Sequence, residues 1–382
     1  MGSNTEFRKK NNQNHFNIYG KGHFMPGQVT DDSEMAMSQA FAILDNDKYN
    51  TLNQNLLFYY YVLWFSSRPL DVGITIRSAL SSLTLNNVSL DNEHIFNEDI
   101  KNKIFQKNNK SLANGFLMRS SPFLTWFYMI HKNYIKQILE TKSTDKYLEL
   151  YIKISKEIEK DAQITHPNPE NAISGSIVIF MGLCSIQQKY SGKEILEMVG
   201  ILFKNNYFNK KKNIEYKIKV HFEGVLKDIS QPNFSKDNFF GNLSFQMGFY
   251  KHAFNLIIYY LYVFDDLKKT MYLKDIFNNI MFDISDFGGD TDTNGAIVGM
   301  IIGPLIGMEN FDSNYFDPLL KFYSKKRIIY TSVFMYFYAV YLKKIENSKL
   351  PVSNDNKYKV NFNVIKILLN MLNTDIKNSL EL

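Results

Sequence analysis

Apolar residues recur every three or four positions along most of this 382-residue chain, with polar residues between them. This spacing predicts amphipathic helices, because residues three and four apart lie on the same helical face. No stretch alternates apolar and polar residues between paired turns as strands do, and no segment repeats at a fixed period. We therefore expect an all-α protein. Its helices should span Asp32 to Asp45, Leu52 to Ser67, Ile74 to Leu83, a stretch through Leu124 and Met129, Ser143 to Glu159, Ala172 to Ser185, Ser244 to Phe264 and Ala296 to Met308.

Polar stretches between these helices indicate how the chain is divided. Residues 1–22 predict a flexible N-terminal segment, and residues 23–382 predict a single all-helical domain. Turn signals among Lys, Asn and Phe predict a loop-rich insertion at 204–240, with a short helix near His221. Three further features are an Asn-rich connection over 84–110, one or two helices over 316–346, and a polar linker over 350–358 before an amphipathic helix at Asn361 to Leu372.

Composition narrows the class of protein. Hydrophobic residues make up 45% of the chain and aromatic residues 15%, which is typical of a globular protein. The net charge is +6, and much of the lysine lies beside asparagine in 101–110 and 204–219. Such runs are typical of solvated loops, although they could also steer a diphosphate substrate. The sequence has no zinc finger, RNP-like strand or basic heptad region, so we expect no nucleic-acid partner.

The chain's location is indicated by three features. Its one cysteine, Cys184, lies in an apolar run, so no internal disulfide can form and a small core residue is expected. Residues 1–21 lack the apolar core of a signal peptide. The longest charge-free apolar run, Ala296 to Met308, is too short to span a bilayer. We expect a soluble, intracellular monomer, cytoplasmic or nuclear, without a membrane partner.

The most informative stretch is Gly288-Gly289-Asp290-Thr291-Asp292-Thr293-Asn294-Gly295. Two carboxylates alternate with two hydroxyls without an adjacent Lys or Arg, a set of hard oxygen ligands suited to Mg²⁺ or Mn²⁺. The helix that follows carries a glycine at every fourth position, which lets another backbone approach one face. The alternative is an Asp/Thr cap on a core helix, because acidic groups at a helix N-terminus are favoured by its dipole.

A second acidic cluster lies near the start of the chain. Thr30, Asp31 and Asp32 follow a Pro-Gly turn and open the predicted helix at Asp32. Adjacent aspartates repel each other in a dry site unless a cation lies between them. The two clusters could therefore each supply half of a two-metal site.

These motifs carry a family resemblance. TDDSEM at 30–35 and GGDTDTNGAIVG at 288–299 resemble the ADP-ribosylglycohydrolase family, which includes the dinitrogenase-reductase-activating glycohydrolases. The resemblance runs from about residue 26 to residue 308 and implies a compact orthogonal multi-helix bundle. It also implies two divalent cations, Mg²⁺ or Mn²⁺. Their expected ligands are Thr30, Asp31 and Asp32 from one side and Asp290, Asp292 and Thr293 from the other.

A middle motif is expected to bind substrate. Ser111-Leu112-Ala113-Asn114-Gly115 is a turn whose backbone N–H groups could cradle a phosphate, or a plain Asn-Gly loop. The family holds ADP-ribose with a Gly-Ser-x-x-Asn-Gly-x-x-Met-Arg segment, which implies that Ser111, Asn114 and Gly115 bind substrate. Lys110 and Phe116 depart from that pattern, and we expect them to reshape the rim of the pocket.

Other motif residues have both a structural and a functional interpretation. His166 precedes a proline, where a histidine is often structural, but the family's His-Pro lies against the substrate. Glu34 matches a TDD-x-E pattern and is also an ordinary first-turn residue, so we expect it to be structural. Trp64 to Gly73 resembles a Trp–Ser–Pro–Asp–Gly element, in which Asp71 is expected to cap the next helix. The family's Gly-Asp-x-x-Gly helix has no match before Thr30.

The resemblance implies a metal-dependent hydrolase that cleaves the N- or O-glycosidic bond between ADP-ribose and a modified protein side chain. Asp31 or Asp32 is expected to align or deprotonate the attacking water, and Asp292 is a candidate for the same role. The alternatives are a catalytically silent ADP-ribose-binding or structural relative, which the unmatched helix favours, and a metal phosphohydrolase acting on another nucleotide. The linkage remains open among arginine, serine, poly(ADP-ribose) and small conjugates.

Overall fold

The computed structural model describes residues 27–46, 50–81, 83, 95–211, 213–241 and 243–311. Within these ranges every regular element is a helix, and an isolated bridge between Ala113 and Phe249 is the one strand-like pairing. The all-α prediction is confirmed. The α-helices are α1 (Asp31–Leu44), α2 (Gln54–Ser66), α3 (Ile74–Leu80), α4 (Glu98–Asn108), α5 (Ser121–Thr141), α6 (Thr144–Thr165), α7 (Pro169–Ile186), α8 (Gly192–Phe203), α9 (Ile214–Ile229), α10 (Lys236–Phe240), α11 (Tyr250–Thr270), α12 (Leu273–Phe287) and α13 (Thr291–Ile306); the 3₁₀ turns are η3 (Asn114–Phe116), η4 (Asn206–Asn209) and η5 (Met308–Asn310).

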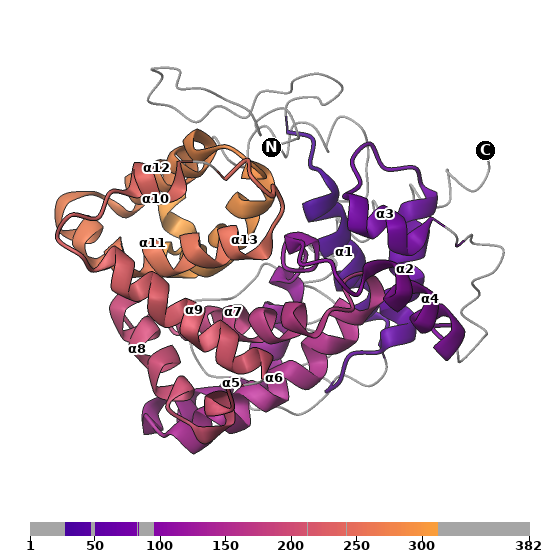
Figure 1. The fold of residues 1–382 in the computed structure, drawn as a ribbon, viewed down its shortest axis with the longest axis horizontal. Coiled ribbons are helices and arrows are strands. Elements are labelled where there is room, and N and C mark those ends of the chain that lie inside the picture. Colours follow the sequence, from indigo (N-terminus) through magenta and orange to yellow (C-terminus); the bar gives the residue numbers. More distant parts are fainter. Residues whose placement is uncertain are drawn as a thin grey trace, which may run out of the picture.

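Helix α7 forms the centre of the molecule, with α5, α6, α8 and α13 packed around it (Figure 1). Its 18 residues are long and apolar enough to cross a membrane, but 78% of them are buried inside the protein. Burial of this kind identifies α7 as a core helix. Cys184 lies on it and is fully buried, as a small core residue.

Side-chain caps fix where several helices begin. The side chains of Asn53, Asn97, Ser143 and Ser191 accept backbone N–H bonds at the starts of α2, α4, α6 and α8. Such bonds satisfy N–H groups that have no partner inside the helix. Helix α8 has the reciprocal capping box as well, because Glu194 accepts from the backbone of Ser191.

Several predicted boundaries were wrong. The connection over 84–110 contains α4, which the low apolar content of EDIKNKIFQKN concealed. The stretch 204–240 is more helical than expected, because it contains α9 and α10. Helix α3 is capped by Gly73 rather than by Asp71. The predictions for residues 1–22, 316–346, 350–358 and 361–372 lie outside the described residues.

The glycine face of α13 also differs from expectation. Outside the helix itself, a Cβ added to Gly295, Gly299 or Gly303 would meet only a side chain within 4 Å, from Met281, Phe277 and Phe311 respectively. The face therefore receives the side chains of α12 and of the chain beyond η5, and no neighbouring backbone lies against these three glycines.

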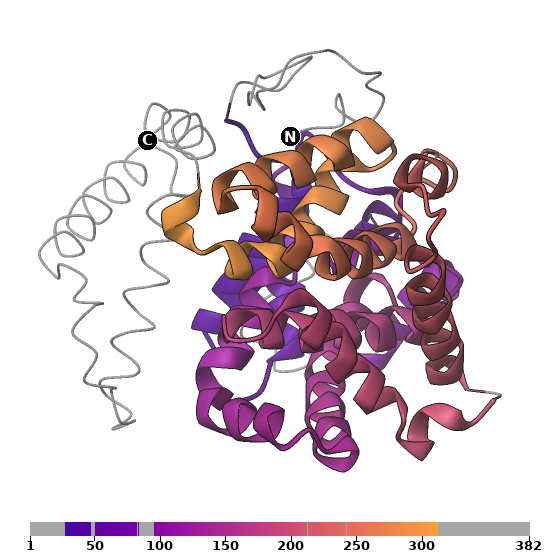
Figure 2. The same ribbon diagram turned by 90° about the vertical axis from the view of Figure 1, so that its left-hand side faces the viewer.

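The helix order brings the two ends of the described chain together. The C-terminal helices α11–α13 pack on the layer that contains α7, and α13 also contacts α1 (Figure 2). Because α1 and α13 each begin with an acidic motif, this contact places the two motifs in one region of the molecule.

Candidate active site

The two acidic motifs lie at the N-termini of α1 and α13, but their N-cap side chains do not cap these helices. Thr30 occupies the N-cap position of α1 and Asp290 that of α13, and both are good capping residue types. Neither side chain makes a capping hydrogen bond. The capping interpretation of these motifs therefore fails, and their oxygens are directed elsewhere.

The side-chain oxygens of the first motif make hydrogen bonds within the motif and to the segment before α3. The hydroxyl of Thr30 donates to Asp32 Oδ2 at 2.9 Å, and the backbone N–H of Gly73 donates to Asp31 Oδ2 at 3.0 Å. The other oxygen of Asp32, Oδ1, is buried and has no hydrogen-bond partner in the protein. A buried carboxylate oxygen without a partner carries a desolvation cost that a bound cation would offset.

A glycine turn presents the second motif. Gly289 has a φ of +74°, and a Cβ on it would lie 2.4 Å from the carbonyl oxygen of Leu243. Only glycine fits this left-handed position against a neighbouring backbone. The turn delivers Asp290 to Asn114, whose side-chain amide donates to Asp290 Oδ2 at 2.9 Å.

The two motifs are in direct contact. The side chain of Thr293 lies close enough to Asp32 to lower the pKa of that carboxyl, and α13 packs against α1. Asp292 lies in the same turn of α13 and is buried. All six residues predicted as metal ligands are thus found at the adjoining starts of these two helices.

Burial and mutual repulsion make this cluster costly to ionise. Burial, followed by repulsion from Asp32 and Asp71, raises the pKa of Asp31 to about 8. Burial, followed by repulsion from Asp290, raises the pKa of Asp32 to about 6. These carboxylates therefore favour a positive charge in the site, whether protons or a metal ion supply it.

The donor set fits a hard divalent cation. Carboxylate and hydroxyl oxygens are the ligands that Mg²⁺ and Mn²⁺ prefer. Among the described residues, no three Asp, Glu, His or Cys side chains converge as a ready metal site. Thr30 and Thr293, which the resemblance implies as ligands, both lie against Asp32.

Asp71 also belongs to the acidic site, although the sequence did not predict it as a site residue. It is half-buried in the connection between α2 and α3, and burial raises its pKa, with further repulsion from Asp290. The same segment supplies the Gly73 N–H that binds Asp31. The Trp–Ser–Pro–Asp–Gly resemblance includes this residue, for which the sequence predicts the role of a helix cap.

The predicted substrate turn lies beside the second motif. Asn114 and Gly115 are buried in η3, and Ser111 shares a hydrogen bond of 2.8 Å between its hydroxyl and that of Thr75. Two amides of this turn are already used, because Ser111 N–H donates to Asn108 and Asn114 N–H donates to Gly248. These amides are not available to a phosphate, so that part of the phosphate-cradle expectation was wrong.

His166 lies against the same turn. It ends α6, and its Nδ1 is 2.8 Å from the hydroxyl of Thr165. Its Nε2 is buried without a hydrogen-bond partner, and a Cβ on Gly115 would lie 3.2 Å from it. Burial, followed by repulsion from Arg119, holds the pKa of His166 well below its usual range, so the ring is neutral.

Two of the remaining motif residues serve the fold. Phe116 is fully buried and a Cβ on Gly175 of α7 would lie 2.7 Å from its ring, so it does not form the pocket rim as expected. Glu34 accepts a hydrogen bond of 2.8 Å from the indole N–H of Trp64, which ties α1 to α2. This contact agrees with the structural role expected of Glu34.

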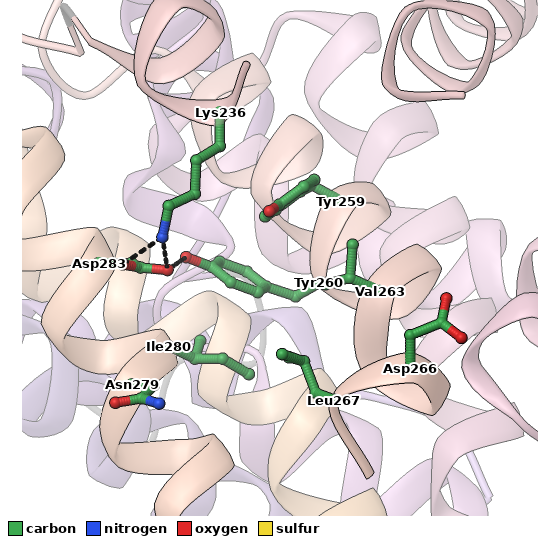
Figure 3. A pocket seen from close by; sticks show the side chains of 9 residues that line it. All are labelled: Lys236, Tyr259, Tyr260, Val263, Asp266, Leu267, Asn279, Ile280 and Asp283. Carbon is green, nitrogen blue, oxygen red and sulfur yellow. Dashed lines mark hydrogen bonds and ion pairs between the residues drawn. The ribbon is translucent and has the colours of Figure 1, made fainter. Parts of the chain in front are cut away.

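A separate cavity of about 510 Å³ lies between α10, α11 and α12 (Figure 3). Lys236 pairs with both carboxylate oxygens of Asp283 at 2.7 Å, and Tyr260 donates to the same carboxylate at 3.2 Å. These polar groups satisfy one another, and none of the predicted site residues lines this cavity.

The protein is all-α. Two acidic motifs meet at the N-termini of α1 and α13, beside an Asn-Gly turn. These features define a class of all-α proteins with an oxygen-rich acidic site. The chain matches the ADP-ribosylglycohydrolase family over residues 1–336, and it belongs to that family. This confirms the resemblance carried by the two acidic motifs. The family assigns the chain to glycohydrolases in general, with ADP-ribose-linked compounds as the implied substrates.

Individual relatives are more distant. A protein of Acanthamoeba polyphaga mimivirus, named as a candidate ADP-ribosyl glycohydrolase, is 26% identical over 318 residues, which is 80% of this chain and 82% of the viral protein. A solved structure described as an ADP-ribosylglycohydrolase-related protein complex has 14% identity and a TM-score of 0.46, and the match covers 79% of this chain and 81% of that one. Membership of the family therefore rests on the family match.

Proposed function

We propose that this protein is a metal-dependent hydrolase that removes ADP-ribose from modified protein side chains by cleaving an N- or O-glycosidic bond. The observation that carries the proposal is the hydrogen bond from Asn114 to Asp290, which joins the substrate turn to an acidic motif. The contact between Thr293 and Asp32 supports it, because it joins that motif to the first one. Substrate and metal ligands would thus share one site.

Two divalent cations, Mg²⁺ or Mn²⁺, would be held by Thr30, Asp31 and Asp32 from α1 and by Asp290, Asp292 and Thr293 from α13. Such cations polarise hydroxyl groups and lower the pKa of bound water. All six side chains carry oxygen ligands, and five of them are buried: Thr30, Asp31, Asp32, Asp292 and Thr293.

The substrate would be oriented by neutral groups. His166 is neutral and its Nε2 lacks a protein partner, so it can exchange a hydrogen bond with a ribose hydroxyl. Ser111 offers a half-buried hydroxyl on the same turn. Gly115 lets the His166 ring pack directly against the turn, because a Cβ at this position would lie 3.2 Å from the ring.

Bond cleavage would depend on the carboxylates. Departure of the side chain from the anomeric carbon creates oxocarbenium character, which nearby negative charge stabilises. Asp31, Asp32 or Asp292 would align the attacking water and accept its proton. The carboxylates that do not act on the water would balance the charge that develops on the ribose.

The test is release of ADP-ribose from arginine-linked and serine-linked peptides in the presence of Mg²⁺, Mn²⁺ or EDTA. Metal-dependent release from one peptide would fix the reaction and the linkage together. Asp290→Asn and Asp292→Asn should each abolish release while the fold survives. Asp237→Asn, which changes an exposed carboxylate in the first turn of α10, is the matched control and should retain full activity.

Full activity in EDTA would refute the metal requirement, and full activity in both site variants would refute the site. Tight ADP-ribose binding without release would instead identify a binding protein. Release of phosphate rather than ADP-ribose would identify a phosphohydrolase.

A further inference from the structure

The turn before α11 exposes two large apolar side chains. Phe245 is 69% exposed and Met247 is 45% exposed. The sequence predicts a helix from Ser244, which would include Phe245, but the helix starts at Tyr250. The connection before α3 is similar, because Leu70 is 63% exposed and Ile74 is 89% exposed.

Both segments border the acidic site. Gly73, next to Ile74, donates its N–H to Asp31 Oδ2 at 3.0 Å. Gly248, next to Met247, lies on the other side, where a Cβ on it would be 3.4 Å from Asp290 Oδ2. The four exposed side chains therefore belong to the two segments that touch the carboxylates of opposite acidic motifs.

The turn that carries Phe245 and Met247 is held in place by backbone contacts. Gly248 has a φ of +81°, and its carbonyl accepts the Asn114 N–H at 2.7 Å. Ala113 and Phe249 pair as an isolated bridge, and the carbonyl of Phe245 lies 2.9 Å from Nε2 of His252. A turn fixed in this way presents its apolar side chains outward without leaving them free to fold back into the core.

The large exposed side chains of the two segments are apolar. Residues 69–76 (PLDVGITI) and 243–250 (LSFQMGFY) contain no Lys or Arg, and the cationic residues next to them are Arg68, Arg77 and Lys251. Phosphates in proteins are bound mainly by cationic side chains and backbone N–H groups. Exposed apolar side chains gathered beside a site instead mark a surface that binds another apolar surface.

We propose that Leu70, Ile74, Phe245 and Met247 form an apolar rim that binds the polypeptide carrying the ADP-ribose, through apolar side chains that neighbour the modified residue. The proposal rests on the proposed function, which places the scissile bond over the carboxylates between the two segments. The rim gives the enzyme a preference among protein substrates that the ADP-ribose contacts cannot provide, since every substrate carries the same ADP-ribose.

The test compares three conjugates of the same linkage: a peptide with leucine and phenylalanine beside the modified residue, a peptide with serine in those places, and the ADP-ribosylated free amino acid. The wild-type protein should show a kcat/KM about tenfold higher for the apolar peptide than for the serine peptide, mainly through KM. The Ile74→Ser/Phe245→Ser double variant should bring the two peptides to equal kcat/KM. Its kcat/KM for the free amino-acid conjugate should match that of the wild type.

Tyr272→Ser is the matched control, because Tyr272 is 79% exposed and lies at the end of α12 remote from the glycine turn. It should leave all three values unchanged. Equal kcat/KM for the two peptides in the wild type would overturn the proposal. So would a double variant that loses the free amino-acid conjugate as well, because the rim would then bind the nucleotide.

Failure of the proposed function has a different signature. If none of the three conjugates is hydrolysed, the glycohydrolase activity is wrong, and dissociation constants for the same three conjugates then decide the rim proposal. A Kd about tenfold lower for the apolar peptide, lost in the double variant, would support the rim. Equal Kd values would refute it.

Discussion

The side-chain amide of Asn114 donates a hydrogen bond of 2.9 Å to the carboxylate of Asp290, across 176 positions of sequence. The bond gives Asp290 a fixed orientation that its N-cap position alone does not provide, because its side chain makes no capping bond. It also explains why the substrate turn needs an amide rather than a carboxylate at position 114, since a second negative charge would repel Asp290.

Asn114→Ala should weaken Mg²⁺ binding. A hydrogen bond to a charged group contributes about 1.5–3 kcal/mol, so its loss should raise the Kd for Mg²⁺ by about tenfold or more. Titration calorimetry of the purified variant measures this directly. Asn53→Ala, which removes only the side-chain cap of α2, is the control and should leave the Kd unchanged. An unchanged Kd in Asn114→Ala would show that Asp290 is oriented by other contacts.

The stability of the metal-free protein should fall as the pH rises from about 4 to about 8. Burial and repulsion raise the pKa of Asp31 to about 8 and that of Asp32 to about 6, so the folded protein holds protons that the unfolded chain has lost. Raising the pH through this window removes those protons at a cost to the folded state alone. Mg²⁺ replaces the protons, so the increase in Tm that it causes should be larger at pH 8 than at pH 5.

Thermal unfolding in EDTA and in Mg²⁺ at several pH values checks this dependence. Asp31→Asn is the control, because it removes the group with the higher pKa and should flatten the pH dependence in EDTA. A Mg²⁺-induced shift in Tm that is the same at pH 5 and pH 8 would contradict the prediction.

Local patterns in the sequence predicted much of the fold. Helical periodicity predicted most of the helices, and the two acidic motifs were recognisable because residue type and spacing are local properties. The contact of Thr293 with Asp32 could not be predicted from spacing, because it depends on how α1 and α13 pack. The resemblance to a known family supplied that pairing of the motifs.

The errors have physical causes. Asp71 has the residue type of a helix cap, and only the packing of its loop beside Asp31 brings it into the acidic site. Phe116 replaces a smaller residue of the family pattern, and it is buried because Gly175 leaves room for its ring. Phe245 continues an apolar helical period, but the positive φ of Gly248 interrupts the helix between it and Tyr250.

Arg119→Met should lower the free energy of unfolding more than a typical surface substitution does. Arg119 and Asp161 are fully buried and paired at 3.0 Å, and the guanidinium lies 4.2 Å from the centre of the Tyr61 ring. Removing one partner of a buried ion pair leaves an unpaired charge and typically costs about 3–5 kcal/mol. Denaturant unfolding at pH 7 measures the loss.

Lys189→Met is the matched control for this ion pair. It breaks the pair between Lys189 and Glu140, which are 2.7 Å apart on the surface. Exposed pairs contribute little to stability, so the midpoint of unfolding should barely move. Equal losses in Arg119→Met and Lys189→Met would mean that Asp161 is protonated or finds another donor in the variant.

Gly289→Ala should reduce both stability and metal binding. A Cβ at this position would lie 2.4 Å from the Leu243 carbonyl, and the φ of +74° disfavours any side chain. Relief of this contact requires the turn to move, at a cost of about 2 kcal/mol or more, and the turn carries Asp290. We expect a lower Tm together with a Mg²⁺ Kd raised by about tenfold.

Gly224→Ala separates the effect of the turn from the effect of the substitution itself. Gly224 lies inside α9, and no atom lies within 4 Å of a Cβ added there. Alanine should therefore stabilise that helix by up to about 1 kcal/mol and leave the Mg²⁺ Kd unchanged. If Gly289→Ala lowers the Tm but retains wild-type Mg²⁺ affinity, the glycine turn supports the fold without orienting Asp290.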